Sequence, residues 1–220
     1  MVRTRMGGRV VLALVIVVCM SAAVALGATS RTYAWSFGDR TWRISVVLSE
    51  TSFEYFASLP RGSDYSAYVA HGANRDALAT VVDALGKAAR SAGFDPEKTA
   101  GLVISFVQGL PYVADDGAEG LLEYPKYPLE TLFGGGDCED TAILAAALMK
   151  DLGLSVGLLH FVGTLPAHMA VGVALPAGVR GTYFPWEGKR YYYGETTEPG
   201  WSIGEVPPFY RGEPAYIELV

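Results

Sequence analysis

The chain has 220 residues, of which 50% are hydrophobic and 18% are charged, and its formal net charge is -6. This composition suits one folded domain with a short appendage, and it excludes a disordered chain. The negative charge argues against a nucleic-acid partner, because phosphate recognition needs concentrated lysine and arginine. Cysteine occurs only as Cys19, in the apolar N-terminal stretch, and Cys138, in mid-chain, which excludes a disulfide framework.

Residues 1–28 form a separate N-terminal segment. Arg3, Arg5 and Arg9 precede an uncharged apolar stretch over residues 10–28. As a helix this stretch would span ~28 Å, close to the thickness of a bilayer core, so it predicts one transmembrane helix with its N-terminus in the cytoplasm. A cleaved signal peptide is the alternative. Both interpretations export the domain, which is either membrane-anchored on the extracytoplasmic side or secreted.

The rest of the chain, residues 29–220, has the pattern of one α+β domain. Alternating side chains predict a strand over residues 41–49, and apolar side chains at helical spacing predict a helix over residues 74–92. Asp95 before a proline at position 96 predicts the start of a further helix. A loop rich in proline, tyrosine and acids is expected over residues 111–130.

A helix that is apolar on nearly all sides follows a run of glycines. Asp137 is the predicted N-cap of this helix, which covers residues 138–152. Because it lacks a polar face, we expect it to be buried. Three strand-like runs come after it, over residues 155–162, 168–175 and 189–195. The order predicts a central helix packed on an antiparallel sheet.

The lengths of these elements bring three residues to one rim of the domain. The helix and each strand span ~20–23 Å, so every strand returns the chain across the full length of the helix. Cys138 begins the helix, His168 begins the second strand and Glu195 ends the third. A Cys–His–carboxylate triad would let the acid orient the imidazole and the imidazole activate the thiol. Glu198 is the alternative acid, since strand ends are placed only to within a few residues.

The same geometry predicts a reactive thiol. A helix N-terminus and a paired imidazolium both favour an anion, so we expect the pKa of Cys138 to be lowered. The two other histidines fit less well. His160 lies inside its strand and reads as a structural histidine, and nothing ties His71 to Cys138.

Motifs at these positions resemble those of transglutaminase-like domains. Residues 135–141 (GGDCEDT), 168–173 (HMAVGV) and 193–197 (YGETT) are similar to the nucleophile, histidine and acid segments of that superfamily. Residues 106–112 (FVQGLPY) and 124–128 (YPKYP) are similar to a prokaryotic, often archaeal, branch with a membrane-anchored layout.

The resemblance implies a papain-like fold and acyl transfer through a thioester. It gives Cys138 as nucleophile, His168 as general base and acid, and Glu195 as the orienting acid, although animal transglutaminases usually carry aspartate in this last place. An oxyanion hole is expected from the backbone N–H of Cys138, free at the helix start, and from the side chain of Gln108, as a glutamine serves in papain-like proteases.

No cofactor and no metal site are expected from the sequence. One cysteine in the domain and three scattered histidines lack the spacing of zinc ligands. The acidic loop at residues 115–120 lacks the regular spacing of a calcium loop.

These observations predict an exported thiol enzyme that hydrolyses peptide or amide bonds, like a cysteine protease, with a peptide or protein as substrate. Two alternatives remain open. If a lysine amine rather than water resolved the thioester, the protein would be a crosslinking transglutaminase. A non-catalytic module that binds peptides or envelope components is the alternative from another class.

Overall fold

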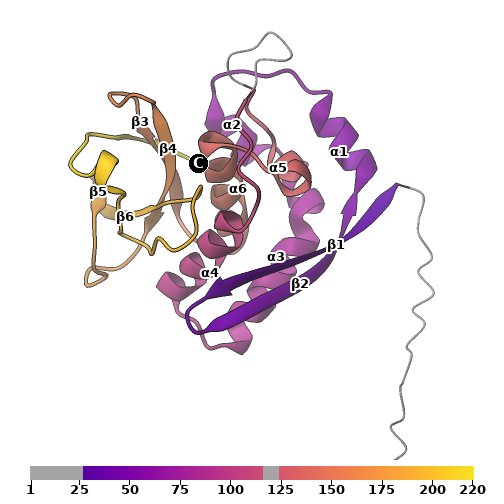
Figure 1. Cartoon of the computed structure of the whole chain (residues 1–220), viewed down its shortest axis with the longest axis horizontal. Coiled ribbons are helices and arrows are strands. Elements are labelled where there is room, and N and C mark those ends of the chain that lie inside the picture. Colours follow the sequence, from indigo (N-terminus) through magenta and orange to yellow (C-terminus); the bar gives the residue numbers. More distant parts are fainter. Residues whose placement is uncertain (1–26, 116–123) are drawn as a thin grey trace, which may run out of the picture.

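The computed structural model describes residues 27–115 and 124–220 (Figure 1). The predicted membrane segment, residues 10–28, lies almost wholly outside the described residues. Within the described ranges, no helix combines the length and the apolar character that crossing a bilayer requires.

Two strands come first along the chain, then a run of helices, and then the remaining strands. In order they are β1 (Ala28–Phe37), β2 (Arg40–Ser49), α1 (Glu50–Ala57), α2 (Tyr65–Ala70), α3 (Asn74–Ser91), α4 (Pro96–Gln108), α5 (Pro128–Gly134), α6 (Cys138–Asp151), β3 (Val156–Phe161), β4 (His168–Ala174), β5 (Tyr183–Trp186), β6 (Lys189–Gly194), a 3-10 turn (Pro208–Tyr210) and β7 (Tyr216–Leu219). Strands β1 and β2 form an antiparallel hairpin, and the others form a second antiparallel sheet in the order β5-β6-β4-β3-β7.

Helix α6 is the centre of the domain (Figure 1). Its side chains are buried from Glu139 to Met149, and it packs against β3 and β4 on one side and against α2 to α5 on the other. Ala145 and Ala146 lie in the middle of this helix and are fully buried, and their small side chains let the neighbouring elements approach closely. The predicted central helix on an antiparallel sheet is therefore confirmed, in a mixed α and β fold.

The register of the sheet brings the start of β4 and the end of β6 to the same region. His168 pairs with Phe161 at the end of β3, and three residues further along β4, Val171 pairs with Gly194. A Cβ atom at Gly194 would lie 2.5 Å from Cδ1 of Ile104, so the end of β6 lies close to α4 and a larger residue there would push this side chain aside. This close approach places the residues that follow β6 beside both α4 and β4.

Several elements were missed at the sequence level. The predicted strand over residues 41–49 is β2, but its partner β1 was not predicted, nor were β5 and β7. Helices α1 and α2 are only 8 and 6 residues long, which is too short for helical periodicity to stand out. The predicted loop over residues 111–130 ends early, because α5 begins at Pro128 with a capping box between Tyr127 and Glu130.

Candidate active site

A rigid glycine turn places Cys138 at the first position of α6. Gly135 has a φ of 78°, and a Cβ atom there would lie 2.2 Å from the carbonyl oxygen of Pro111. The N–H of Gly136 donates to that same carbonyl at 3.2 Å, and Val113 N–H donates to the Gly136 carbonyl at 3.0 Å. Only glycine fits at position 135, and the turn is tied to the chain segment that follows α4.

The first turn of α6 is held from two further directions. Asp140 lies fully buried, and its carboxylate accepts from the backbone N–H of Lys126 at 2.6 Å and forms an ion pair with the Lys126 ammonium. Burial raises the pKa of Asp140 to about 6, although Lys126 opposes this shift. The hydroxyls of Thr141 and Thr196 are hydrogen-bonded at 2.9 Å, which links the helix to the segment after β6.

His168 and Glu195 form a direct hydrogen bond, with 3.1 Å between imidazole Nε2 and carboxylate Oε2. The hydroxyl of Tyr193 donates to the same Oε2 at 2.6 Å. The other oxygen, Oε1, accepts from the N–H groups of Thr196 and Thr197, each at 3.0 Å, and from the Thr197 hydroxyl at 2.8 Å. All acceptor positions of the carboxylate are therefore used.

These donors fix the protonation of the pair. Burial raises the pKa of Glu195, but the hydrogen bond and charge of His168 and the Tyr193 hydroxyl outweigh it and lower the pKa to about 2. An ionised carboxylate can only accept, so the imidazole proton sits on Nε2. The Nδ1 atom of His168 is then the ring nitrogen that is available to take a proton.

Cys138 and His168 line one cavity of about 520 Å³, together with Glu195. The backbone N–H of Met169, next to His168 on β4, hydrogen-bonds the Cys138 thiol. Tyr112 and Tyr210 also line this cavity. The structure thus brings Cys138, His168 and Glu195, which the sequence singled out, to one cavity.

The thiol itself differs from the expectation. Burial and the carboxylate of Glu139 raise the pKa of Cys138, and the Met169 N–H lowers it only in part. Glu139 Oε2 lies 3.5 Å from Cys138 Sγ, so this acid faces the thiol and does not point away from it. The thiol is therefore protonated at rest, and a base must take its proton when a substrate binds.

Glu198 and Gln108 are placed differently from their expected roles. Glu198 lines the cavity, but the carboxylate bonded to His168 is that of Glu195. The amide nitrogen of Gln108 donates to the backbone carbonyls of Glu195 at 2.9 Å and of Trp201 at 3.1 Å. Gln108 therefore braces the segment that carries the acid, and its amide N–H groups are already used.

The other histidines lie away from this cavity. His160 lies beside Glu218 on β7, with 2.9 Å between Nε2 and Oε2, and its ring stacks on Tyr216 at 4.3 Å. His71 contacts the rings of Phe56 and Tyr127. Both have structural surroundings, which agrees with the interpretation from the sequence.

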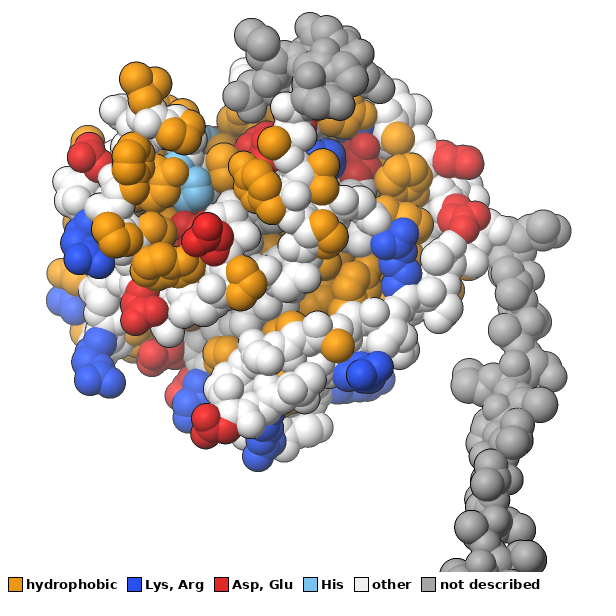
Figure 2. All heavy atoms as spheres, in the orientation of Figure 1, with side chains coloured by type: hydrophobic (Ala, Val, Ile, Leu, Met, Phe, Trp, Pro, Cys, Tyr) orange, Lys and Arg blue, Asp and Glu red, His pale blue; other side chains and the backbone are white. Residues whose placement is uncertain are grey.

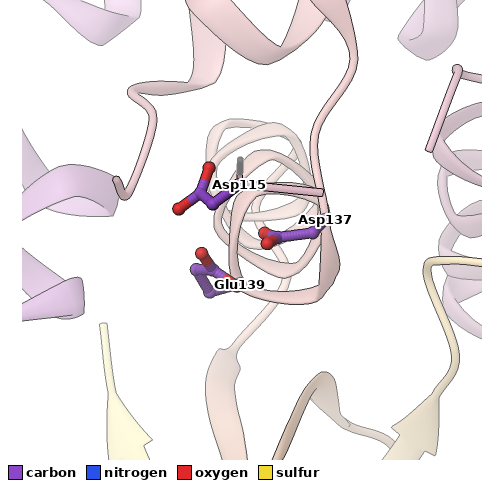
Figure 3. A group of neighbouring side chains, drawn as sticks. All are labelled: Asp115, Asp137 and Glu139. Atoms are coloured by element: carbon purple, nitrogen blue, oxygen red, sulfur yellow. The ribbon is translucent and has the colours of Figure 1, made fainter. Parts of the chain in front are cut away.

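Three carboxylates converge beside Cys138, and the sequence did not predict this cluster. Figure 3 shows Asp115, Asp137 and Glu139 pointing toward one another at the start of α6, and ligand oxygens of all three lie within 4.8 Å of each other. Asp137 Oδ1 and Glu139 Oε1 are buried and have no hydrogen-bond partner in the described part of the chain. Burial and Asp137 raise the pKa of Glu139 to about 9.

This arrangement fits a hard divalent cation, which prefers oxygen ligands. The Lys126 ammonium, 3.7 Å from Asp115, offsets only part of the charge. The signal in the sequence was the pair of acids on either side of Cys138. Of the acidic loop at residues 115–120, only Asp115 lies within the described residues.

No protein-family model matches this chain, and no curated protein matches it. Among solved structures, three of LapG from Legionella pneumophila are similar to it: LapG at 18% identity (TM-score 0.42), EGTA-treated LapG at 19% (0.43) and calcium-bound LapG at 20% (0.40). In the same order, the matches cover 71%, 71% and 78% of this chain. They cover 79%, 77% and 81% of the three LapG chains.

Proposed function

We propose that this protein is a thiol enzyme of transglutaminase-like, papain-like type that cleaves peptide or amide bonds through a Cys138 thioester. The observation that carries the proposal is the shared cavity of Cys138 and His168, in which an ionised Glu195 fixes the imidazole proton on Nε2. A thiol, a base with a free nitrogen and an orienting acid are the groups that acyl transfer needs.

The chemistry follows from these protonation states. His168 Nδ1 takes the Sγ proton while Cys138 Sγ bonds to the substrate carbonyl carbon. His168 then gives this proton to the leaving nitrogen as the C–N bond breaks, which leaves a thioester on Cys138. Water attacks the thioester with His168 as base, and the products are a carboxylic acid and the free thiol.

The developing oxyanion needs donors near Cys138. The N–H of Cys138 is at the first position of α6, where no intrahelical acceptor exists, and no described group accepts from it. It is our candidate for one oxyanion donor. Because Gln108 is bound elsewhere, its amide is not part of this proposal.

Exposed hydrophobic side chains at the rim of the cavity support a peptide or protein substrate. Tyr112 is 58% exposed, Leu165 is 90% exposed and Phe209 is 60% exposed, and each lines the cavity or directly precedes a residue that does. Figure 2 shows hydrophobic side chains gathered on the sheet side of this face, near acidic ones. Apolar surface of this kind is typical of a site that binds another chain.

A thiol-directed activity probe tests the proposal. The wild type is expected to be labelled, Cys138→Ala to be unlabelled and His168→Ala to react far more slowly. Peptide substrates with and without an added primary amine then separate hydrolysis from crosslinking. If the folded wild type is not labelled, with or without calcium, the protein is a binding module.

We further propose that Asp115, Asp137 and Glu139 hold a divalent cation, and calcium suits this oxygen-only set. The two buried oxygens without partners support this, because such atoms are costly unless they are bound. A bound cation would offset the negative charge beside Cys138.

Export of the domain is also a proposal, and it rests on the apolar stretch over residues 10–28. Expression in a prokaryotic host followed by fractionation tests it. Membrane-bound, full-length protein is the expected result. Soluble protein that is shorter by ~2–3 kDa, about the mass of a 15–30-residue leader, would instead indicate a cleaved signal peptide.

A further inference from the structure

Tyr210 lies flat against the imidazole of His168. The two ring centroids are 4.2 Å apart and the ring planes differ by 8°. Tyr210 ends the 3-10 turn Pro208–Tyr210, far along the chain from both β4 and the acid segment, and it also lines the cavity. None of the sequence motifs includes it.

The turn that carries Tyr210 is held in place. The N–H of Tyr210 donates to the carbonyl of Pro207 at 3.0 Å, and the carbonyl of Tyr210 accepts from the N–H of Glu213 at 3.2 Å. Its ring also contacts that of Phe161 on β3, at 5.7 Å between centroids. The ring therefore packs against both Phe161 on β3 and His168 on β4.

The hydroxyl of Tyr210 has no part in this contact. Among the described residues, no hydrogen bond involves it, whereas the Tyr193 hydroxyl is bonded to Glu195. Burial raises the pKa of Tyr210, as do the nearby thiol and Glu195. What Tyr210 offers to His168 is an aromatic face.

We propose that Tyr210 is a positioning residue for His168. The parallel ring blocks rotation of the imidazole, so that Nε2 stays on Glu195 and Nδ1 stays directed at its proton-transfer partner. This inference rests on the proposed function, because that function gives His168 its role.

Two substitutions separate the contribution of the Tyr210 ring from that of its hydroxyl. Tyr210→Phe retains the aromatic face, and it is expected to keep the thiol-probe rate and the turnover rate of the wild type. Tyr210→Ala removes the face, and it is expected to lower kcat on the order of 10²-fold with a small change in KM, since a slightly misplaced base is costly.

The chain contains a matched control pair. Tyr216 stacks on His160 at 4.3 Å with 10° between the planes, which is nearly the same geometry at a histidine outside the cavity. Tyr216→Ala therefore removes a similar stacking contact. It is expected to leave the thiol-probe rate unchanged.

A spectroscopic measurement tests the positioning directly. With only three histidines, ¹⁵N-histidine labelling and His168→Ala identify the Nε2–H resonance of His168. This proton is expected to be protected from exchange in the wild type and in Tyr210→Phe, and to exchange rapidly in Tyr210→Ala. An unchanged His160 resonance would show that Tyr210→Ala is folded.

The outcomes distinguish this inference from the proposed function. If Tyr210→Ala keeps both the protected proton and the wild-type rate, the inference is wrong, while labelling at Cys138 still supports the enzyme. If the wild type is not labelled, the proposed function fails, and the exchange of the Nε2 proton still decides whether Tyr210 holds the imidazole.

Discussion

The carboxylate of Glu139 lies 3.5 Å from the thiol of Cys138, its neighbour in the chain. Both side chains leave the first turn of α6, where Glu139 is buried and Cys138 is partly buried. Burial and, after it, this contact explain why the pKa of the thiol is raised at a helix N-terminus, where the helix dipole alone would lower it. Any activation of the thiol must overcome this contact.

Replacement of Glu139 by Gln is expected to lower the apparent pKa of Cys138. The substitution removes one negative charge that opposes the thiolate, and at this distance in a partly screened site the charge is worth on the order of one pKa unit. The rate of iodoacetamide alkylation against pH, measured with EGTA present, reports the shift. Because the pKa of Glu139 itself is about 9, the two profiles should differ most at and above that pH. Superimposable profiles would contradict this account.

Glu195→Gln is expected to destabilise the protein in a pH-dependent way. The folded pKa of Glu195 is about 2, below its ordinary value of 4.5, so its ionised form stabilises the fold above pH 4.5. This contribution, on the order of 3 kcal/mol at neutral pH, is lost as the pH falls from 4.5 toward 2. Urea unfolding at pH 7 and at pH 2.5 should therefore show a difference between wild type and variant that shrinks with acid.

Glu198→Gln is the control for this prediction, because Glu198 lines the same cavity without bonding to His168. It should retain wild-type acid stability and thiol reactivity. Glu195→Gln should lose reactivity on the order of 10²-fold or more, since the amide no longer fixes the imidazole proton on Nε2. Equal losses in both variants would mean that the cavity needs net charge and not a specific orienting acid.

Element lengths were enough to predict where Cys138, His168 and Glu195 meet, because a buried helix and antiparallel strands of equal length return the chain to one rim. Contacts between side chains were not predictable in the same way. The direction of the Glu139 carboxylate depends on which side of α6 is covered by the segment that contains Asp115. The stacking of Tyr210 depends on the path of an irregular segment, which has no periodicity to read.

Gln108 donates its amide N–H groups to two backbone carbonyls, which differs from the oxyanion-hole role that the sequence predicted for it. Gln108→Leu is expected to cost about 1–3 kcal/mol of unfolding free energy, because the carbonyls of Glu195 and Trp201 would lose a buried donor. Activity should fall together with stability and recover where the fold is intact, at lower temperature. If turnover instead slowed on the order of 10²-fold or more while stability stayed unchanged, the result would support Gln108 as a donor in the oxyanion hole.

Calcium is expected to raise the melting temperature of the wild type through the cluster of Asp115, Asp137 and Glu139. Ligand at 100 times its dissociation constant stabilises a fold by about 2.7 kcal/mol, which a thermal melt resolves easily. Asp115→Asn removes one ligand without touching the start of α6, and it should abolish most of the shift. Asp83→Asn removes an exposed acid that pairs with Lys87 on α3, and it should leave the shift intact.

Isothermal titration with calcium should give one site in the wild type and in Asp83→Asn. If neither method detects binding at millimolar calcium, the three carboxylates are an acidic cluster without a cation, and the unpartnered oxygens of Asp137 and Glu139 need another explanation.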